Sequence, residues 1–121
     1  MLSERTRGLV GEPELALMKP SAYLINTSRG PIVDEAALVA ALVSRRIAGA
    51  GLDVYDVEPP PPDHALRSLQ NVMLSPHLGY VTRELLGAIY SETVEDVAAW
   101  LAGAPVRIAN RDALQGQVST G

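Results

Sequence analysis

The chain has 121 residues, which is enough for one domain with a modest hydrophobic core. Its composition is 47% hydrophobic and 20% charged with a formal net charge of −4, so it offers no broad cationic surface for nucleic acid. Its longest apolar run, residues 36–43, is too short to span a membrane. There is no cysteine and there are only two histidines, His64 and His77, so we expect no disulfide, no metal site and a cytoplasmic location.

The first part of the chain alternates between helical and strand patterns. Pro13 and the apolar residues after it predict a short helix that ends before Pro20. The apolar run at residues 22–25 then predicts a buried strand. Asp34 is a candidate N-cap, because its carboxylate can accept hydrogen bonds from the free N–H groups of a helix over residues 35–44.

The middle of the chain continues the same alternation. Residues 50–55 predict a second short strand, and the prolines at 59–62 predict a stiff extended loop. One helical turn is expected around residues 65–69, before a third strand over residues 72–74. Strands that alternate with helical connections are typical of an α/β fold with a parallel sheet.

A long amphipathic helix is predicted from Arg83 onward, with Thr82 as its N-cap and Gly103 and Pro105 at its end. The side chains expected on its packing face recur at helical spacing and are Leu86, Ile89, Tyr90, Thr93, Val94, Val97 and Leu101. We expect residues 107–121 to form a polar, mobile tail.

Polar side chains stand at the ends of the three predicted strands. Arg29 follows the first strand, Asp53 and Glu58 lie at the end of the second, and His77 follows the third. Ligands of open parallel sheets bind beyond the carboxyl ends of the strands, so we expect these side chains to converge there. Each also has an ordinary interpretation: Arg29 could pair with Asp34 or cap a carbonyl, and Glu58 and His77 could be solvated loop residues. Asp53 is different, because a carboxylate in an apolar strand needs hydrogen-bond donors.

The three groups together suit the chemistry of hydroxy acids. The guanidinium of Arg29 can hold a carboxylate through two parallel hydrogen bonds. His77 can exchange a proton with a substrate hydroxyl near neutral pH, and a neighbouring carboxylate such as Glu58 would favour its imidazolium form. A bound hydride carrier would complete the interconversion of a 2-hydroxy acid and a 2-keto acid.

Three stretches of the sequence carry a family resemblance. They are ELALMKPSAYLINTSRGPIVDEAAL, IAGAGLDVYDVEPPP and NVMLSPHLGYVT, in this order. Together they resemble the D-isomer-specific 2-hydroxyacid dehydrogenase family, which includes D-3-phosphoglycerate, glycerate and formate dehydrogenases. The resemblance extends from about Leu2 to about Val106, which is nearly the whole chain.

The resemblance implies a role for individual residues. Arg29 would bind the substrate, Glu58 would orient the histidine, and His77 would be the acid/base; these are the catalytic candidates. Asp53 would hold the nicotinamide carboxamide of the cofactor. The cofactor-binding positions implied by the family are Thr27, Ser28, Arg29, Asp53, His77 and Gly79.

The resemblance also implies an incomplete site. Family members begin with part of a substrate domain and then a strand, a glycine-rich turn and a helix that bind the dinucleotide pyrophosphate. The only G-x-G in this sequence, at residues 49–51, leads into a predicted strand, so we expect it to be a helix-to-strand connection. We therefore expect residues 1–106 to be the second half of a doubly wound, Rossmann-type NAD-binding domain, with the long helix leading back toward a missing substrate domain.

The activity implied by the family is that of an NAD(P)-dependent oxidoreductase acting on the CH–OH group of a D-2-hydroxy acid. NAD is the expected cofactor and NADP stays open, and the expected partner is a small 2-hydroxy or 2-keto acid. Half of a doubly wound sheet would leave an apolar edge strand, so we also expect a homodimer. Two alternatives remain at this point: a non-catalytic module that senses the dinucleotide for regulation, and an inactive gene fragment.

Overall fold

The computed structural model describes residues 2–110 and divides the chain into two compact units, residues 1–79 and residues 80–121. The polar tail expected at residues 107–121 therefore lies almost wholly outside the described residues, and the domain boundary expected at residue 106 stays a prediction. No helix within residues 2–110 is both long enough and apolar enough to cross a membrane.

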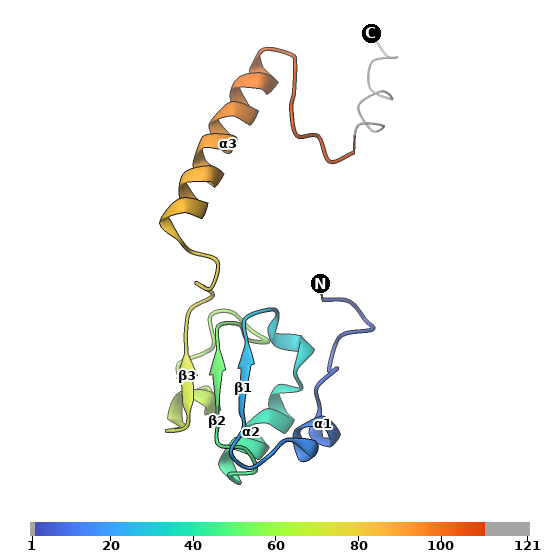
Figure 1. The fold of residues 1–121 in the computed structure, drawn as a ribbon, viewed down its shortest axis with the longest axis vertical. Helices are drawn as coiled ribbons and strands as arrows, with labels where there is room; N and C mark the ends of the chain where they lie inside the picture. The colour runs from blue at the N-terminus through green and yellow to red at the C-terminus, as the bar shows by residue number, and fades with distance from the viewer. Residues whose placement is uncertain (1, 111–121) are drawn as a thin grey trace. The chain divides into compact units, whose positions relative to one another are not determined.

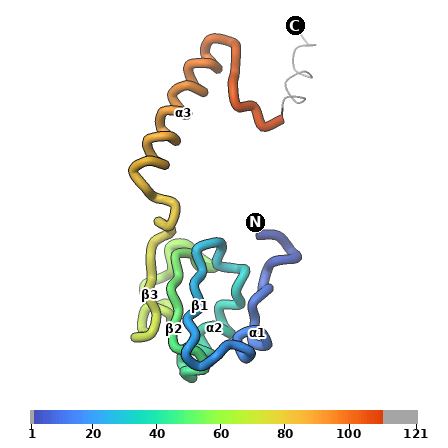
Figure 2. Tube along the Cα trace, in the orientation of Figure 1, coloured from blue at the N-terminus to red at the C-terminus, as the bar shows by residue number. Residues whose placement is uncertain are grey.

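The first unit is built on a three-stranded parallel sheet, shown with its labels in Figure 1. The strands are β1 (Tyr23–Asn26), β2 (Gly49–Leu52) and β3 (Val72–Leu74), and they lie in this order in the sheet. Both pairings are parallel, as the alternation of strands and helices predicted. The three strands therefore end at the same edge of the sheet (Figure 2).

The two α-helices of this unit begin where Pro13 and Asp34 predict. α1 covers Glu12–Leu17 and α2 covers Glu35–Val43. The Asp34 carboxylate caps α2 by accepting a 3.0 Å hydrogen bond from the Ala37 N–H, as expected. Two short 3-10 helices complete the unit, η1 (Gly30–Ile32) and η2 (Ala65–Ser68); the sequence predicted only the second.

The hydrophobic core lies against one face of the sheet. Leu24 and Leu52 point into it from β1 and β2, and α2 contributes Leu38 and Leu42. Leu42 is completely buried, and burying a leucine of this kind contributes roughly 1.5–3 kcal/mol to stability. On the opposite face, the side chains that alternate with the core residues are exposed; they are Tyr23, Ile25 and Met73.

Two predictions about β2 were wrong. The strand ends at Leu52, so Asp53 follows the strand and does not lie inside it. Residues 49–51 are not a helix-to-strand connection, because they form β2 itself. Gly49 is needed there for space, because a Cβ on it would overlap the Asn71 carbonyl oxygen.

The second unit contains α3 (Arg83–Leu101), the long helix predicted from the sequence. Thr82 caps it, since its hydroxyl accepts a hydrogen bond from the Leu85 N–H at 3.1 Å. None of the helix residues is fully buried, and its apolar side chains, among them Tyr90 and Leu101, stay exposed. After the helix, Arg107 forms salt bridges with Glu95 at 2.5 Å and Asp96 at 2.8 Å.

Candidate active site

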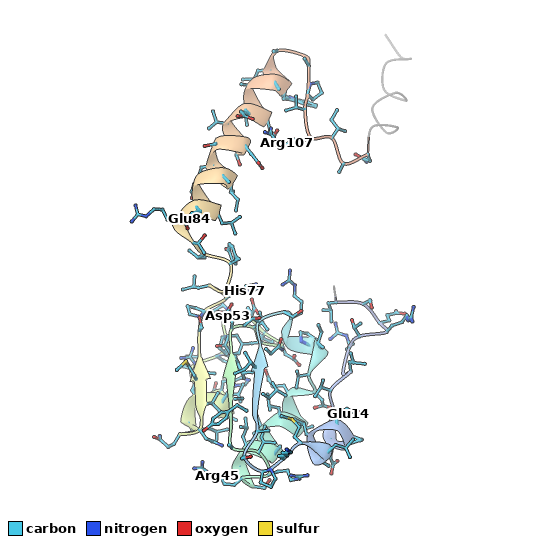
Figure 3. The ribbon with its side chains drawn as sticks, viewed as in Figure 1. Glu14, Arg45, Asp53, His77, Glu84 and Arg107 are labelled. Atoms are coloured by element: carbon cyan, nitrogen blue, oxygen red, sulfur yellow. The ribbon has the colours of Figure 1, made fainter. Side chains whose placement is uncertain are left out.

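The candidate site lies at the edge where the three strands end. Figure 3 labels Asp53 and His77, which lie close together just beyond β2 and β3. The segment after β1 carries Arg29, and the loop after β2 carries Glu58. All of these residues belong to the first compact unit.

His77 and Glu58 form a direct pair. His77 Nδ1 lies 2.6 Å from Glu58 Oε2, although the two residues are 19 positions apart, and both side chains are about one-third exposed. A carboxylate can only accept, so Nδ1 carries the hydrogen in this pair. The other carboxylate oxygen accepts a 2.9 Å hydrogen bond from the Tyr55 backbone N–H. The ring is thereby fixed with its second nitrogen, Nε2, directed away from Glu58.

The hydrogen bonds around Glu58 keep it ionised. The bond from His77 lowers the pKa of the Glu58 carboxyl most, followed by the bond from the Tyr55 N–H, while partial burial opposes them. The positive charge of Arg29 acts in the same direction, to a smaller extent. A carboxylate that stays charged near neutral pH can orient the imidazole and stabilise its protonated form.

Asp53 is buried, with 5% of its surface exposed, and it holds the turn that carries His77. Its oxygens accept hydrogen bonds from the Leu78 N–H at 2.8 Å and the Gly79 N–H at 2.7 Å. The Ser75 side chain donates as well, and this bond is the largest cause that holds the pKa of Asp53 below its usual range; the two backbone bonds add to it and burial opposes it. The donors that a buried carboxylate requires therefore come from residues 75–79.

The turn held by Asp53 has an unusual backbone. His77 has a φ of +58°, in the left-handed region that residues with a Cβ seldom adopt. Two of the N–H groups that Asp53 binds come immediately after His77, so the carboxylate stabilises this conformation directly. The position of the imidazole thus depends on a residue of another strand end.

Arg29 is exposed and lies three residues after the end of β1. Its Nη1 donates to the Ser28 carbonyl at 2.6 Å, and within residues 2–110 no salt bridge involves it. The alternative pair with Asp34 is therefore wrong, whereas the alternative in which Arg29 caps a carbonyl agrees with its bond to Ser28. Because the residue is exposed, its guanidinium is accessible to a carboxylate from solution.

Two residues that shape the site were not identified from the sequence. Asn26, buried at the end of β1, donates to the Arg29 carbonyl at 3.0 Å and accepts from the Ser28 N–H at 3.1 Å, so it fixes the backbone that carries Arg29. The sequence feature that could have identified Asn26 is its polar amide at the end of the apolar run over residues 22–25. Tyr55 gave no such signal, because its hydroxyl contacts depend on a residue 20 positions further along the chain.

The residues at this edge fit a nicotinamide group. Gly79 lies tightly against Asp53, because a Cβ on it would come within 2.9 Å of Asp53 Oδ2 and 3.9 Å of Thr27 Cβ, so the glycine keeps this edge free of a further side chain. Thr27 and Ser28 are exposed beside it. A flat ring with a carboxamide suits this combination of small residues and hydrogen-bonding groups.

Comparison with known proteins decides the family. Residues 1–79 match the family model described as "D-isomer specific 2-hydroxyacid dehydrogenase, NAD binding domain". The chain belongs to this family. The expected Rossmann-type α/β fold and the expected nicotinamide dinucleotide cofactor are thereby confirmed for the family.

The chain is similar to relatives from several bacteria. It is 48% identical to the glyoxylate/hydroxypyruvate reductase B of Enterobacter agglomerans over 102 residues, which cover 84% of this chain and 32% of that protein. The crystal structure of a D-isomer specific 2-hydroxyacid dehydrogenase from Xanthobacter autotrophicus is 43% identical with a TM-score of 0.76, over 88% of this chain and 35% of the other. A structure of the X. autotrophicus dehydrogenase with NADPH and MES gives a TM-score of 0.67 over 88% of this chain and 43% of the other. The chain spans about a third of the length of the curated relatives it matches.

Proposed function

We propose that this chain supplies the proton-transfer and carboxylate-binding residues of an NAD(P)-dependent oxidoreductase that acts on the CH–OH group of a D-2-hydroxy acid. The observation that carries the proposal is the 2.6 Å pair of His77 and Glu58 at the sheet edge shared with Arg29. The family and the pairing support each other, because proton exchange with a substrate hydroxyl needs a base held in a fixed direction, and Glu58 holds the ring of His77.

Each residue has one task in the proposed reaction. Arg29 binds the substrate carboxylate and holds the carbon that bears the hydroxyl near His77. His77 Nε2 accepts the hydroxyl proton as the 2-keto acid forms, and Glu58 stabilises the resulting imidazolium. The bound dinucleotide supplies the hydride acceptor. In the reverse direction, His77 returns the proton to the carbonyl oxygen of the keto acid.

The relatives suggest the substrate class. Several similar curated proteins are named glyoxylate or hydroxypyruvate reductases, so a small 2-keto acid of this kind is the proposed substrate. The proposed cofactor is NAD, with NADP as the alternative because a similar enzyme binds NADPH. The expected homodimer and cytoplasmic location also remain proposals. The exposed Tyr23 and Ile25 on the open face of β1 support the dimer.

A chimera tests the proposal without any assumption about the rest of the protein. The 102 matching residues of the Enterobacter agglomerans reductase would be replaced by the corresponding residues of this chain. We expect the chimera to reduce glyoxylate or hydroxypyruvate with a reduced nicotinamide dinucleotide, measured by the loss of its absorbance. An Arg29→Lys variant should raise KM more than it lowers kcat, because lysine cannot form the bidentate contact. A folded chimera that binds dinucleotide but transfers no hydride would contradict the proposal.

A further inference from the structure

Tyr55 contacts all three strand ends that carry the candidate catalytic residues. It lies three positions after β2, is 5% exposed, and belongs to the hydrophobic core of the first unit. Its backbone and its hydroxyl both make polar contacts, and these contacts reach different loops.

The hydroxyl joins the ends of β2 and β3. It lies 2.8 Å from the Ser75 carbonyl oxygen and 3.0 Å from the Leu52 carbonyl oxygen. A phenol has a single hydrogen to donate, so it is shared between the two carbonyls. Ser75 stands two residues before His77, and the hydroxyl therefore ties the start of the histidine turn to the end of β2.

The backbone of Tyr55 contacts the other two groups. Its N–H donates to Glu58 Oε1 at 2.9 Å, which leaves Oε2 for His77. Its carbonyl lies against the backbone of Gly30, so closely that a Cβ on Gly30 would overlap it. Gly30 directly follows Arg29, so the segment after β1 that carries Arg29 is also placed against Tyr55.

We propose that Tyr55 is a positioning residue that sets the spacing of Arg29, Glu58 and His77 by connecting the three strand ends. The inference rests on the proposed function of those three residues. The contacts of Tyr55 can be tested without that function, because loss of the phenol hydroxyl should loosen residues 75–77 and weaken the pair between His77 and Glu58. The aromatic ring would keep its place in the core.

Burial of the hydroxyl agrees with this arrangement. The pKa of Tyr55 is raised above its usual value, mainly because burial disfavours the phenolate. The phenol therefore keeps its proton across the physiological range and can serve as a permanent donor. The pKa of Glu58 depends on the groups that it faces, which are His77, Arg29 and the Tyr55 N–H.

The test is NMR of the 121-residue chain carrying Tyr55→Phe, with Tyr90→Phe as the matched control. Tyr90 is 69% exposed on α3, and its hydroxyl lies outside the first unit. The measured quantities are the pKa of Glu58 from its carboxyl ¹³C shift and the ring signals of His77. We expect Tyr55→Phe to raise the Glu58 pKa toward its usual value and to shift the His77 signals, whereas Tyr90→Phe changes neither. A folded Tyr55→Phe chain with both readouts unchanged would overturn the proposal.

A second measurement applies if Tyr55→Phe prevents folding. In the unsubstituted chain, the exchange rate of each tyrosine hydroxyl hydrogen can be read from the deuterium isotope shift on the ring carbon that bears it. We expect slow exchange for Tyr55 and fast exchange for Tyr90. Exchange of Tyr55 as fast as that of Tyr90 would overturn the proposal. Neither NMR readout depends on enzyme activity. A chimera without activity would therefore contradict the proposed function alone, whereas unchanged NMR readouts would contradict the positioning role of Tyr55 alone.

Discussion

Replacing Glu58 with glutamine should show what the carboxylate contributes to the histidine. Glu58 accepts two hydrogen bonds, from His77 Nδ1 at 2.6 Å and from the Tyr55 N–H at 2.9 Å. A glutamine has one acceptor oxygen and one NH₂ group, so it can satisfy only one of these donors in either orientation. If the NH₂ group faces His77, it donates to Nδ1 and forces the hydrogen onto Nε2. If the NH₂ group faces Tyr55, it meets the Tyr55 backbone N–H, and two donors then lie against each other with no acceptor between them.

The cost to the reaction follows from this geometry. With the hydrogen on Nε2, His77 cannot accept the hydroxyl proton of a hydroxy acid, and no negative charge stabilises its imidazolium. We expect kcat/KM of the Glu58→Gln chimera for hydroxy acid oxidation to fall by about 10²-fold or more, on the scale of general acid–base catalysis. The dinucleotide Kd should stay nearly unchanged, because the hydrogen bonds of Glu58 go to His77 and to the Tyr55 N–H and not to Thr27, Ser28 or Gly79. The assay is the initial rate of dinucleotide reduction, with titration calorimetry for the Kd. An unchanged kcat/KM would refute the assigned role of Glu58.

Three further predictions concern stability and cofactor binding. Hydrogen bonds lower the pKa values of Asp53 and Glu58 in the folded chain. The stability that these two carboxylates contribute should therefore be complete above their unfolded pKa of about 4 and be lost as pH falls through the folded values. Urea unfolding at a series of pH values measures this, and Asp53→Asn should reduce the loss of unfolding free energy at acid pH. Gly30→Ala should destabilise the chain by at least about 1–3 kcal/mol, because its Cβ would overlap the Tyr55 carbonyl. The control Gly87→Ala, in α3 with nothing within 4 Å of its Cβ, should be neutral or stabilising by up to about 1 kcal/mol. Equal effects of the two substitutions in thermal unfolding would contradict the close contact at Gly30. The 121-residue chain alone should bind NADH weakly, because its sequence has no glycine-rich turn after a strand to hold the pyrophosphate, and saturable micromolar binding in calorimetry would be evidence against this.

The regular elements could be predicted because their signals are local. Asp34 and Thr82 mark the beginnings of α2 and α3 through their own side chains, and the apolar run before Asn26 identifies β1. The end of β2 was misplaced because Val54 and Tyr55 continue the apolar run, although the strand pairing stops at Leu52. Hydrophobicity alone does not distinguish a paired strand residue from a buried loop residue.

The candidate site could be predicted only as a set of residue types at strand ends. The sequence indicated Arg29, Glu58 and His77, and the structure places His77 against Glu58. The left-handed φ of His77 and the contacts of Tyr55 depend on residues of other loops, so no local pattern reveals them. Gly30 is required for space, because a Cβ on it would overlap the Tyr55 carbonyl, and no local pattern indicates this contact. Non-local contacts of this kind become visible only after the strands are placed side by side.

The most direct test of the account compares the two histidines of the chain in the same chimera. Each histidine pairs with a glutamate, His77 with Glu58 at 2.6 Å and His64 with Glu35 at 2.8 Å, but His77 follows the end of β3 whereas His64 caps η2. We predict that His77→Gln lowers kcat by about 10²–10⁴-fold with dinucleotide binding retained, and that His64→Gln leaves kcat close to that of the parent chimera. Near-parental turnover in a folded His77→Gln chimera would contradict the assignment of His77 as the acid/base.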